Sequence, residues 1–340
     1  MDEEWTDGMQ ARALREIAWR YLPDEDAVRW ASLLRPGVRL VDEAEAEAEA
    51  EDEDVAGAGA GAVAGAVDET GDAAEPPAAA RLGGLPRLPD GTAWPTGPAG
   101  APLAFVAAVD CAALPARALD VPVPPEGVLA FFASAPLHGG PDGRYRSGEA
   151  GPTPGRVVHI PADAPGSVRT APPGVPVFPS VRLAARPELT APFPEHPRVR
   201  DAFALHTWED PYDHPLYGQG FLDELAEHGH RFEHRVGGYA VCAGAVPVEY
   251  EAAAAAADAD AAGAGGGRAE RVGPLAVGAQ DTGRAREWVL LAQFQCDPAD
   301  GVLAAKAPSG GGRRGVLAWL IHREDLARGR FAESVLLRRF

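Results

Sequence analysis

The sequence predicts an α+β protein with a duplicated β-rich core, made of two related and mainly antiparallel sheet units, and with N-terminal and peripheral helices. Three observations predict this class: a helical period near the N-terminus, short apolar segments bounded by glycine and proline, and a motif order that occurs twice. With 340 residues, the chain is long enough to bury a sizeable core.

Residues 1–41 predict two helices followed by a strand. Apolar residues recur with helical spacing over 9–22, and Pro23 ends this helix because proline lacks an N–H donor. The acidic residues at 24–26 favour the start of a second helix, since negative charge is stabilising at a helix N-terminus. Alternating residues over 38–41 then predict the first short strand.

Two low-complexity segments interrupt the chain. Residues 42–80 pass from alternating Glu and Ala to Ala and Gly without one aromatic residue, so we expect a disordered insertion there. Residues 251–270 are rich in Ala and Gly, and we expect a low-complexity loop. Long surface insertions cost little free energy, so the remaining domain, residues 1–41 and 81–340, can fold around both.

The acidity of the chain resides mainly in the first of these segments. Thirteen acidic residues lie between Asp42 and Glu75, and without them the formal net charge changes from −19 to −6. No basic stripe in the sequence compensates this charge, which argues against nucleic-acid binding. Apolar runs are shorter than the ~20 residues of a membrane span, and the acidic N-terminus is unlike a secretory signal. We therefore expect a cytoplasmic protein without nucleic-acid or membrane partners.

A three-part motif order occurs near residue 100 and again near the C-terminus. Each copy has a Gly-Gly pair, then a strand-like segment that ends in Cys, then a second strand-like segment that begins with Gly-Val-Leu-Ala. The copies are Gly83-Gly84, Phe105–Cys111 and Gly127–Phe132 in the first, and Gly237-Gly238, Leu290–Cys296 and Gly315–Leu320 in the second. We interpret them as two related halves, about 81–135 and 230–340, each presenting an apolar face to the other. Chance similarity of short apolar strands is the alternative.

The segment LGGLPRLPDGTAWP, residues 82–95, opens the first copy. Its prolines and glycines exclude a regular helix or a central strand. We expect a rigid, irregular loop that Trp94 anchors against the rest of the protein.

Seven segments together resemble the YwqG-like family of bacterial proteins of unknown function. In order they read RPGVRL, LGGLPRLPDGTAWP, PLAFVAAVDC, PEGVLAFF, HRVGGY, WVLLAQFQCD and RGVLAWLIHREDLARGRF. The resemblance covers about 36–41, 81–132 and 230–340, and its Gly-Gly-x-Pro-x-x-Pro motif is more specific than the strand segments. It implies a cytoplasmic α+β protein with a duplicated β-rich core, without an established reaction or established catalytic residues. Where the family has a compact connection, this chain has the segment 42–80.

Aromatic residues beside the Gly- and Pro-rich turns are the candidate binding residues. Trp94, Tyr239 and Trp288 can form the walls of a ligand site or anchor a partner, or they can plug the open ends of a sheet. His234 precedes the second Gly-Gly pair, where it can fix the loop by a hydrogen bond or act as an acid or base in a cleft. If the two sets of loops face each other, a groove between the halves is the expected place for a protein partner or a small ligand.

A histidine-rich segment gives the alternative of a metal site. Six of the nine histidines lie within residues 196–234, and histidine with carboxylate ligands suits zinc or another transition metal. The candidate ligands are His206, His230, His234 and Glu233. Their spacing matches no metal motif of known mechanics, so a polar and partly exposed segment is the other interpretation.

The sequence favours a non-enzymatic binding or interaction protein, and an immunity- or antitoxin-like role is one version of it. No serine occupies a G-x-S-x-G motif, and Cys111, Cys242 and Cys296 stand in apolar contexts typical of buried, reduced thiols. We therefore name no catalytic residue and expect no cofactor. The alternative function is a metal-dependent enzyme or metal-binding protein that uses segment 196–234.

Overall fold

The computed structural model describes ten ranges of the chain: 9–43, 78–97, 100–135, 152–207, 210–228, 233–241, 246–263, 279–297, 302–303 and 315–339. Most of the expected insertion, residues 44–77, lies outside these ranges, as do His230, Cys242 and residues 264–270. Within them, no helix is long and apolar enough to cross a bilayer.

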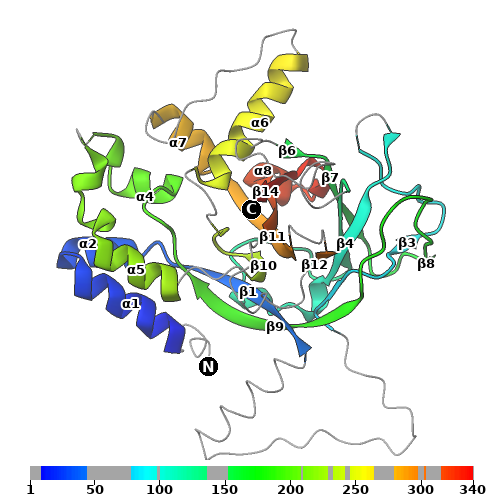
Figure 1. Ribbon diagram of the computed structural model, residues 1–340, viewed down its shortest axis with the longest axis horizontal. Helices are drawn as coiled ribbons and strands as arrows, with labels where there is room; N and C mark the ends of the chain where they lie inside the picture. Colours follow the sequence, from blue (N-terminus) through cyan, green and yellow to red (C-terminus); the bar gives the residue numbers. More distant parts are fainter. Residues whose placement is uncertain are drawn as a thin grey trace, which may run out of the picture.

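Helices lie beside the N-terminus and on the outside of the sheet (Figure 1). The two expected N-terminal helices are α1 (Met9–Tyr21) and α2 (Asp24–Ala31). The other α-helices of the described ranges are α4 (Pro197–Ala202), α5 (Gln219–His228), α6 (Val248–Gly263), α7 (Ala279–Ala285) and α8 (Arg323–Ala327).

Strands occupy most of the remaining ordered chain. They are β1 (Arg35–Asp42), β2 (Ala80–Leu82), β3 (Arg87–Pro89), β4 (Ala104–Asp110), β5 (Val128–Ala133), β6 (Pro152–Thr153), β7 (Gly155–Ile160), β8 (Gly166–Val168), β9 (Val181–Thr190), β10 (His234–Gly237), β11 (Trp288–Asp297), β12 (Val302–Leu303), β13 (Gly315–His322) and β14 (Val335–Arg339). Together with the helices, they confirm the expected α+β class with a β-rich core.

One antiparallel sheet contains both expected sheet units. Its strand order is β6-β14-β13-β11-β10-β1-β9-β2-β4-β5-β7, with β12 paired to β11, and β3 with β8 forms a separate small sheet. Residues 152–160 supply β6 at one edge and β7 at the other, so this short stretch joins the two edges. The sheet therefore curls into a nearly closed barrel, as Figure 1 shows.

The segments that align in the sequence have the same pairing register in the structure. Val109 pairs with Leu129 between β4 and β5, and the aligned residues Phe294 and Leu317 pair between β11 and β13. Both pairs of strands also carry a bulge, between Phe105 and Ala107 in one and at the aligned place in the other. Bulges set local twist, so the two units bend in the same way.

Each unit begins with a strand that pairs with the other unit. The first unit starts with β1, which pairs with β10, and the second starts with β9, which pairs with β2. β1 and β9 pair with each other at the centre of the sheet. The relation shows in the sequence as RPGVRL at 35–40 and FPSVRL at 178–183, a likeness that our sequence analysis missed.

Aromatic side chains fill the inside of the barrel. Phe131 and the ring of Trp319 lie edge to face with centroids 5.2 Å apart, and Phe294 contacts both rings. Val38, Leu82 and other fully buried residues complete this cluster. Because the interior is packed with side chains, we place no ligand there.

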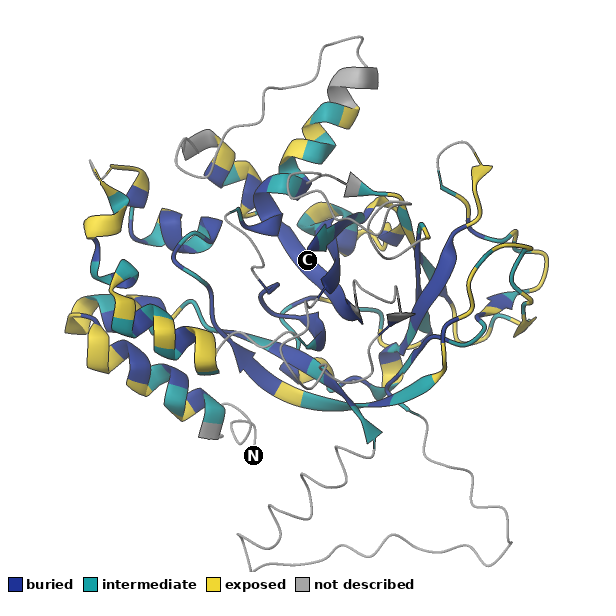
Figure 2. Cartoon of the chain, in the orientation of Figure 1, coloured by how far each residue is buried: buried dark blue, intermediate teal, exposed yellow. Residues whose placement is uncertain are grey.

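The N-terminal helices form a second core against one end of the sheet. Trp30 of α2 packs edge-on against Phe221 of α5 at 5.3 Å, and α1 lies against both helices. Figure 2 shows alternating buried and exposed residues along α1 and α2, whereas the barrel strands are buried over most of their length. This pattern is the one expected of helices with a single apolar stripe.

The segment expected as a low-complexity loop at 251–270 is helical as far as Gly263, as part of α6, so this expectation was wrong there. Alanine has the highest helix propensity, and here the helix also has a surface to cover. Ala252 is fully buried on it and packs with Trp288 and Leu290 on the outer face of the second unit.

Candidate functional site

Both Gly-Gly pairs form turns that only glycine fits. All four residues have positive φ: 63° and 72° at Gly83 and Gly84, and 67° and 69° at Gly237 and Gly238. A Cβ at Gly83 would overlap the carbonyl oxygen of Pro179, and one at Gly238 would lie 2.7 Å from Thr190 Oγ1. Glycine is required at these turns for both conformation and space.

An arginine two residues before each Gly-Gly pair holds the turn in the same way. Arg81 donates from Nη2 to the carbonyl oxygen of Leu85 at 2.7 Å, and Arg235 donates from Nη1 to that of Tyr239 at 3.0 Å. Leu85 and Tyr239 occupy the same position after the turn. The two units thus share their turn geometry down to a side-chain hydrogen bond.

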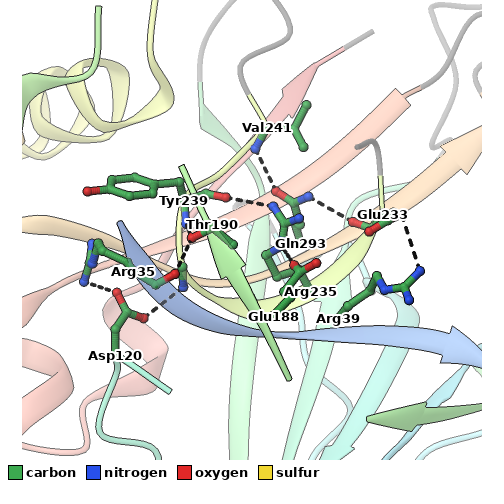
Figure 3. A network of polar contacts seen from close by, with 11 residues as sticks. Arg35, Arg39, Asp120, Glu188, Thr190, Glu233, Arg235, Tyr239, Val241 and Gln293 are labelled. Atoms are coloured by element: carbon green, nitrogen blue, oxygen red, sulfur yellow. Dashed lines mark hydrogen bonds and ion pairs between the residues drawn. The ribbon is translucent and has the colours of Figure 1, made fainter. Parts of the chain in front are cut away.

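The surroundings of the two turns differ. In the first unit, Gly84 N–H donates to the carbonyl oxygen of Phe178, a main-chain contact at 2.9 Å. In the second unit, Gly238 N–H donates instead to Asp120 Oδ1 at 2.8 Å, and Tyr239 N–H donates to Thr190 Oγ1 at 3.1 Å. Side chains from both units therefore converge on the second turn, as Figure 3 shows.

A buried polar network continues from this turn along the outer face of β10 and β11. The Arg235 guanidinium pairs with the Glu188 carboxylate of β9. Gln293 accepts from Val241 N–H at 3.0 Å and donates to the carbonyl oxygen of Glu233 at 2.9 Å, so it clamps the chain on both sides of β10 (Figure 3). These partners satisfy polar groups that burial would otherwise penalise.

We call the surroundings of the second Gly-Gly turn, formed by Arg35, Asp120, Thr190 and Tyr239, the polar corner. Arg35, the first residue of β1, lies at its centre. Its guanidinium pairs with Asp120 and lies 5.4 Å from the centroid of the Tyr239 ring, within the range of a cation–π contact. Its carbonyl oxygen accepts from Thr190 Oγ1 at 2.8 Å. The first turn has Phe178, which precedes β9, at the position of Arg35 and Leu85 at that of Tyr239, so its surroundings are apolar there.

Two more arginines interact electrostatically with Arg35 and Asp120. They are Arg198 of α4 and Arg323, the first residue of α8. Burial lowers the pKa of each guanidinium, and the positive charge of Arg35 lowers both further. The negative charge of Asp120 acts in the opposite direction on both. We call Arg35, Arg198 and Arg323 the Arg35 cluster.

Tyr239 has the role of a buried hydrogen-bond donor at this corner. Its hydroxyl donates to the carbonyl oxygen of Leu33 at 2.6 Å, and its side chain lies among the most buried of the molecule. Burial raises the pKa of Tyr239, while Arg35 and Arg198 oppose that shift only in part. The hydroxyl is therefore protonated near neutral pH.

His196 and Glu249 border the corner on its α4 side. His196 Nδ1 accepts from Arg198 N–H at 3.1 Å, and its Nε2 lies 3.4 Å from Glu249 Oε1. Because Nδ1 is an acceptor, the proton of the neutral ring resides on Nε2 and faces the carboxylate. Burial alone would raise the pKa of Glu249, but His196 and Arg35 outweigh burial, and the pKa is lowered.

A small pocket opens beside these residues. Its lining is Pro192, Phe193, His196, Tyr239, Ala240, Pro247, Val248 and Glu249. The pocket is narrow and mostly apolar, with room for little more than a water-sized group, so we treat it as an extension of the corner.

The structure separates the expected aromatic binding residues. Trp94 donates from Nε1 to the carbonyl oxygen of Leu103 at 2.8 Å and packs edge-on against Phe132, on the outer face of the first unit. Trp288 is buried under α6 in the second unit, in one cluster with Ala240. Of the expected set, only Tyr239 lies at the polar corner.

His234 lies in the wall of the barrel. Its side chain is 3% exposed, its Nδ1 accepts from Gln295 N–H at 3.1 Å, and its ring is tilted against Phe294 at 6.1 Å. This hydrogen bond links β10 to β11.

The residues named as metal ligands are in different surroundings. His206 is exposed in a short 3-10 helix at Leu205–Thr207, whereas Glu233 and His234 lie at the start of β10. In the described ranges, no group of three or more His, Cys, Asp or Glu side chains could hold a metal ion. Cys111 and Cys296 are buried, and burial, with a smaller effect of Asp110, raises the pKa of the Cys111 thiol to about 11.

Of the residues at the polar corner, sequence analysis singled out Tyr239 but none of the charged side chains around it. Arg35 and Arg323 stood inside segments quoted for the family resemblance, RPGVRL and RGVLAWLIHREDLARGRF, which was the one signal available. Asp120 and Arg198 carry no local signature, since isolated charged residues are common on protein surfaces.

The fold and this corner define an α+β protein with a filled antiparallel barrel and one arginine-rich corner to which both units contribute. The chain belongs to the DUF1963 family, a domain of unknown function, whose model matches residues 80–337, more than half of the chain. The matched range contains Asp120, Arg198, Tyr239 and Arg323, whereas Arg35 precedes it. No curated protein matches the chain.

Proposed function

We propose that this protein is a non-enzymatic binding protein of the YwqG-like type and that its ligand binds at the polar corner around Arg35 and Tyr239. The observation that carries the proposal is a difference between two related corners. The units share strand register, bulges and turn hydrogen bonds, and we infer that they arose by duplication. At the first turn, however, apolar Phe178 and Leu85 stand where the second turn has Arg35 and Tyr239.

The polar groups of the corner support binding rather than catalysis. Tyr239 donates to a carbonyl oxygen, Asp120 pairs with Arg35, and His196 is engaged through both ring nitrogens. A general base needs a free acceptor within reach of a substrate proton. Tyr239, Asp120 and His196 are held in static pairs instead, and such pairs give a rigid surface for recognition.

The corner also has the location expected of a site between the halves. Asp120 comes from the first unit, Tyr239 follows the Gly-Gly turn of the second, and Arg35 opens the exchanged strand β1. A ligand bound there would contact both units at once.

Incubation with a fractionated pool of cell metabolites tests this proposal. Thermal unfolding detects binding, mass spectrometry shows whether the bound compound is recovered unchanged, and hydrogen–deuterium exchange locates the protected amides. We expect an unchanged compound that protects residues 35–39, 196–200 and 237–241. A compound that is chemically converted over time, or protection over 86–97 instead, would overturn the proposal.

A further inference from the structure

We propose that the Arg35 cluster, formed by Arg35, Arg198 and Arg323, binds an oxyanion group, a carboxylate or a phosphate, of a small-molecule ligand. This inference rests on the proposed function and adds the chemical group that the corner recognises. Guanidinium groups present planar forks of N–H donors, and oxygens of carboxylates and phosphates are the acceptors that match them.

The carboxylates that face the cluster already have partners. Asp120 pairs with Arg35, Glu249 faces His196 at 3.4 Å, and Glu287 lies 3.3 Å from Arg286. Across the described ranges, no ion pair involves the side chain of Arg198 or Arg323. Arg198 follows His196, whose ring packs edge-on against Tyr239 at 4.7 Å, and the Tyr239 ring lies 5.4 Å from the Arg35 guanidinium. Arg323 N–H donates to the carbonyl oxygen of Glu287, and the neighbouring Arg286 pairs with Asp201 of α4 at 2.9 Å. Like charges gathered at a partly buried place repel one another, and a bound anion would relieve this repulsion.

Arg198 provides a second, independent observation. Its Nε is inaccessible to solvent and has no hydrogen-bond partner among the described residues. A buried donor without a partner is unfavourable, because it has lost water and gained nothing in exchange. Arg198 as a whole residue is partly exposed, so a ligand can approach it from solvent.

The fold holds the arginines in place from three directions. Arg35 is fixed by Asp120 and the Tyr239 ring, and Arg198 N–H donates to His196 Nδ1. Arg323 N–H donates to the carbonyl oxygen of Glu287 at 2.9 Å. Such preorganisation reduces the entropy lost when a ligand binds.

The first unit provides an internal comparison for this site. Counting along the aligned segments, Phe178 takes the place of Arg35 and Ala135 takes the place of Arg323. The same backbone without the guanidinium groups of Arg35 and Arg323 therefore exists in the same molecule, and we assign anion binding to the second corner alone.

Titration of the full chain with inorganic phosphate and, separately, with acetate tests the inference, at an ionic strength kept constant with chloride. Binding is followed by isothermal calorimetry and by the shift in Tm. We expect saturable binding in at least one arm: phosphate alone identifies a phosphate group, and acetate alone identifies a carboxylate. Saturable binding in neither arm would overturn the inference.

Substitutions assign the binding to the cluster. Arg198→Ala and Arg323→Ala should each weaken binding by about tenfold or more, as loss of a charge-assisted hydrogen bond does. Arg198→Lys keeps the positive charge but loses the planar fork of N–H donors. Its affinity for the anion should therefore lie between that of the wild type and that of Arg198→Ala. Arg12→Ala removes the same charge from the exposed side of α1 and should change nothing. Circular dichroism checks that each variant is folded.

Two results would count against the site. Equal weakening by Arg12→Ala would show a general charge effect, and unchanged binding in both cluster variants would place the anion elsewhere. A neutral compound that protects the corner, combined with no response to phosphate or acetate, would overturn this inference and leave the proposed function standing.

Discussion

The turn at Gly83-Gly84 and the turn at Gly237-Gly238 have the same backbone and different surroundings. Both need positive φ at two successive residues, and both are closed by an arginine that binds a carbonyl oxygen. Beside the first turn lies Phe178, and beside the second turn lies Arg35. The comparison shows that the steric requirement for glycine fixes the backbone of both turns. The chemical difference between them comes from neighbouring side chains that this requirement does not restrict.

The two units should lose similar stability when their matched interior rings are removed. Phe131 and Trp319 occupy the same position on β5 and β13, and both are fully buried. We expect Phe131→Ala and Trp319→Ala each to reduce the free energy of unfolding by about 4 kcal/mol, because the barrel cannot collapse around the cavity. Urea unfolding measures the loss. Trp19→Ala, at a side chain 48% exposed, should cost under about 1 kcal/mol.

A smaller effect separates space from conformation at the first turn. Gly83→Ala combines positive φ with an overlap on Pro179, so we expect a loss of about 3 kcal/mol. Gly91→Ala has φ of 78° but no heavy atom within 4 Å of the added Cβ, and should cost about 1 kcal/mol. Equal losses in urea unfolding would show that the backbone angle alone demands glycine.

The smallest expected effect is a pH dependence confined to the polar corner. The pKa of Glu249 is lowered in the folded protein, so its charged form adds stability above its unfolded pKa, and this stability is lost as pH falls through the folded value. Glu249→Gln should lower the free energy of unfolding by about 2 kcal/mol at pH 7.

The difference between this variant and the wild type should shrink as pH falls below about 4.5, the ordinary pKa of a glutamate. The exposed Glu333→Gln serves as the control and should change stability by no more than about 0.5 kcal/mol. A Glu249→Gln deficit that stays constant down to pH 3 would show that its carboxylate is not held in its charged form.

The strands of the core could be predicted from the sequence because each one is marked by a pattern of neighbouring residues. Alternation and the repeated Gly-Val-Leu-Ala start mark β4, β5, β11 and β13, and the gap-free alignment of Phe105–Cys111 with Leu290–Cys296 matches the observed register. Trp94 in its Pro-rich segment was expected to be anchored, and it packs on Phe132.

Two other features could not be predicted, because they depend on contacts between residues that are far apart in the sequence. Helix α6 is low in sequence complexity, and its helical state follows from the apolar sheet face that Ala252 covers. The polar corner joins Arg35, Arg198 and Arg323 from distant parts of the chain, and Arg35 comes from a strand that pairs with the other unit. Such a site can be found from the sequence only when the topology is already known.

The exchange of first strands also constrains how the chain acquires its structure during synthesis. β1 is synthesised early, but its neighbours in the sheet are β9 and β10. Gly37 can pair with Gly237 only after the second of these strands has been synthesised. Until then a strand that carries the apolar Val38, Leu40 and Val41 leaves the ribosome with both edges unpaired, a state that favours association with other chains. Neither unit can complete its sheet alone, so folding of this barrel is a late event that joins segments far apart in the sequence.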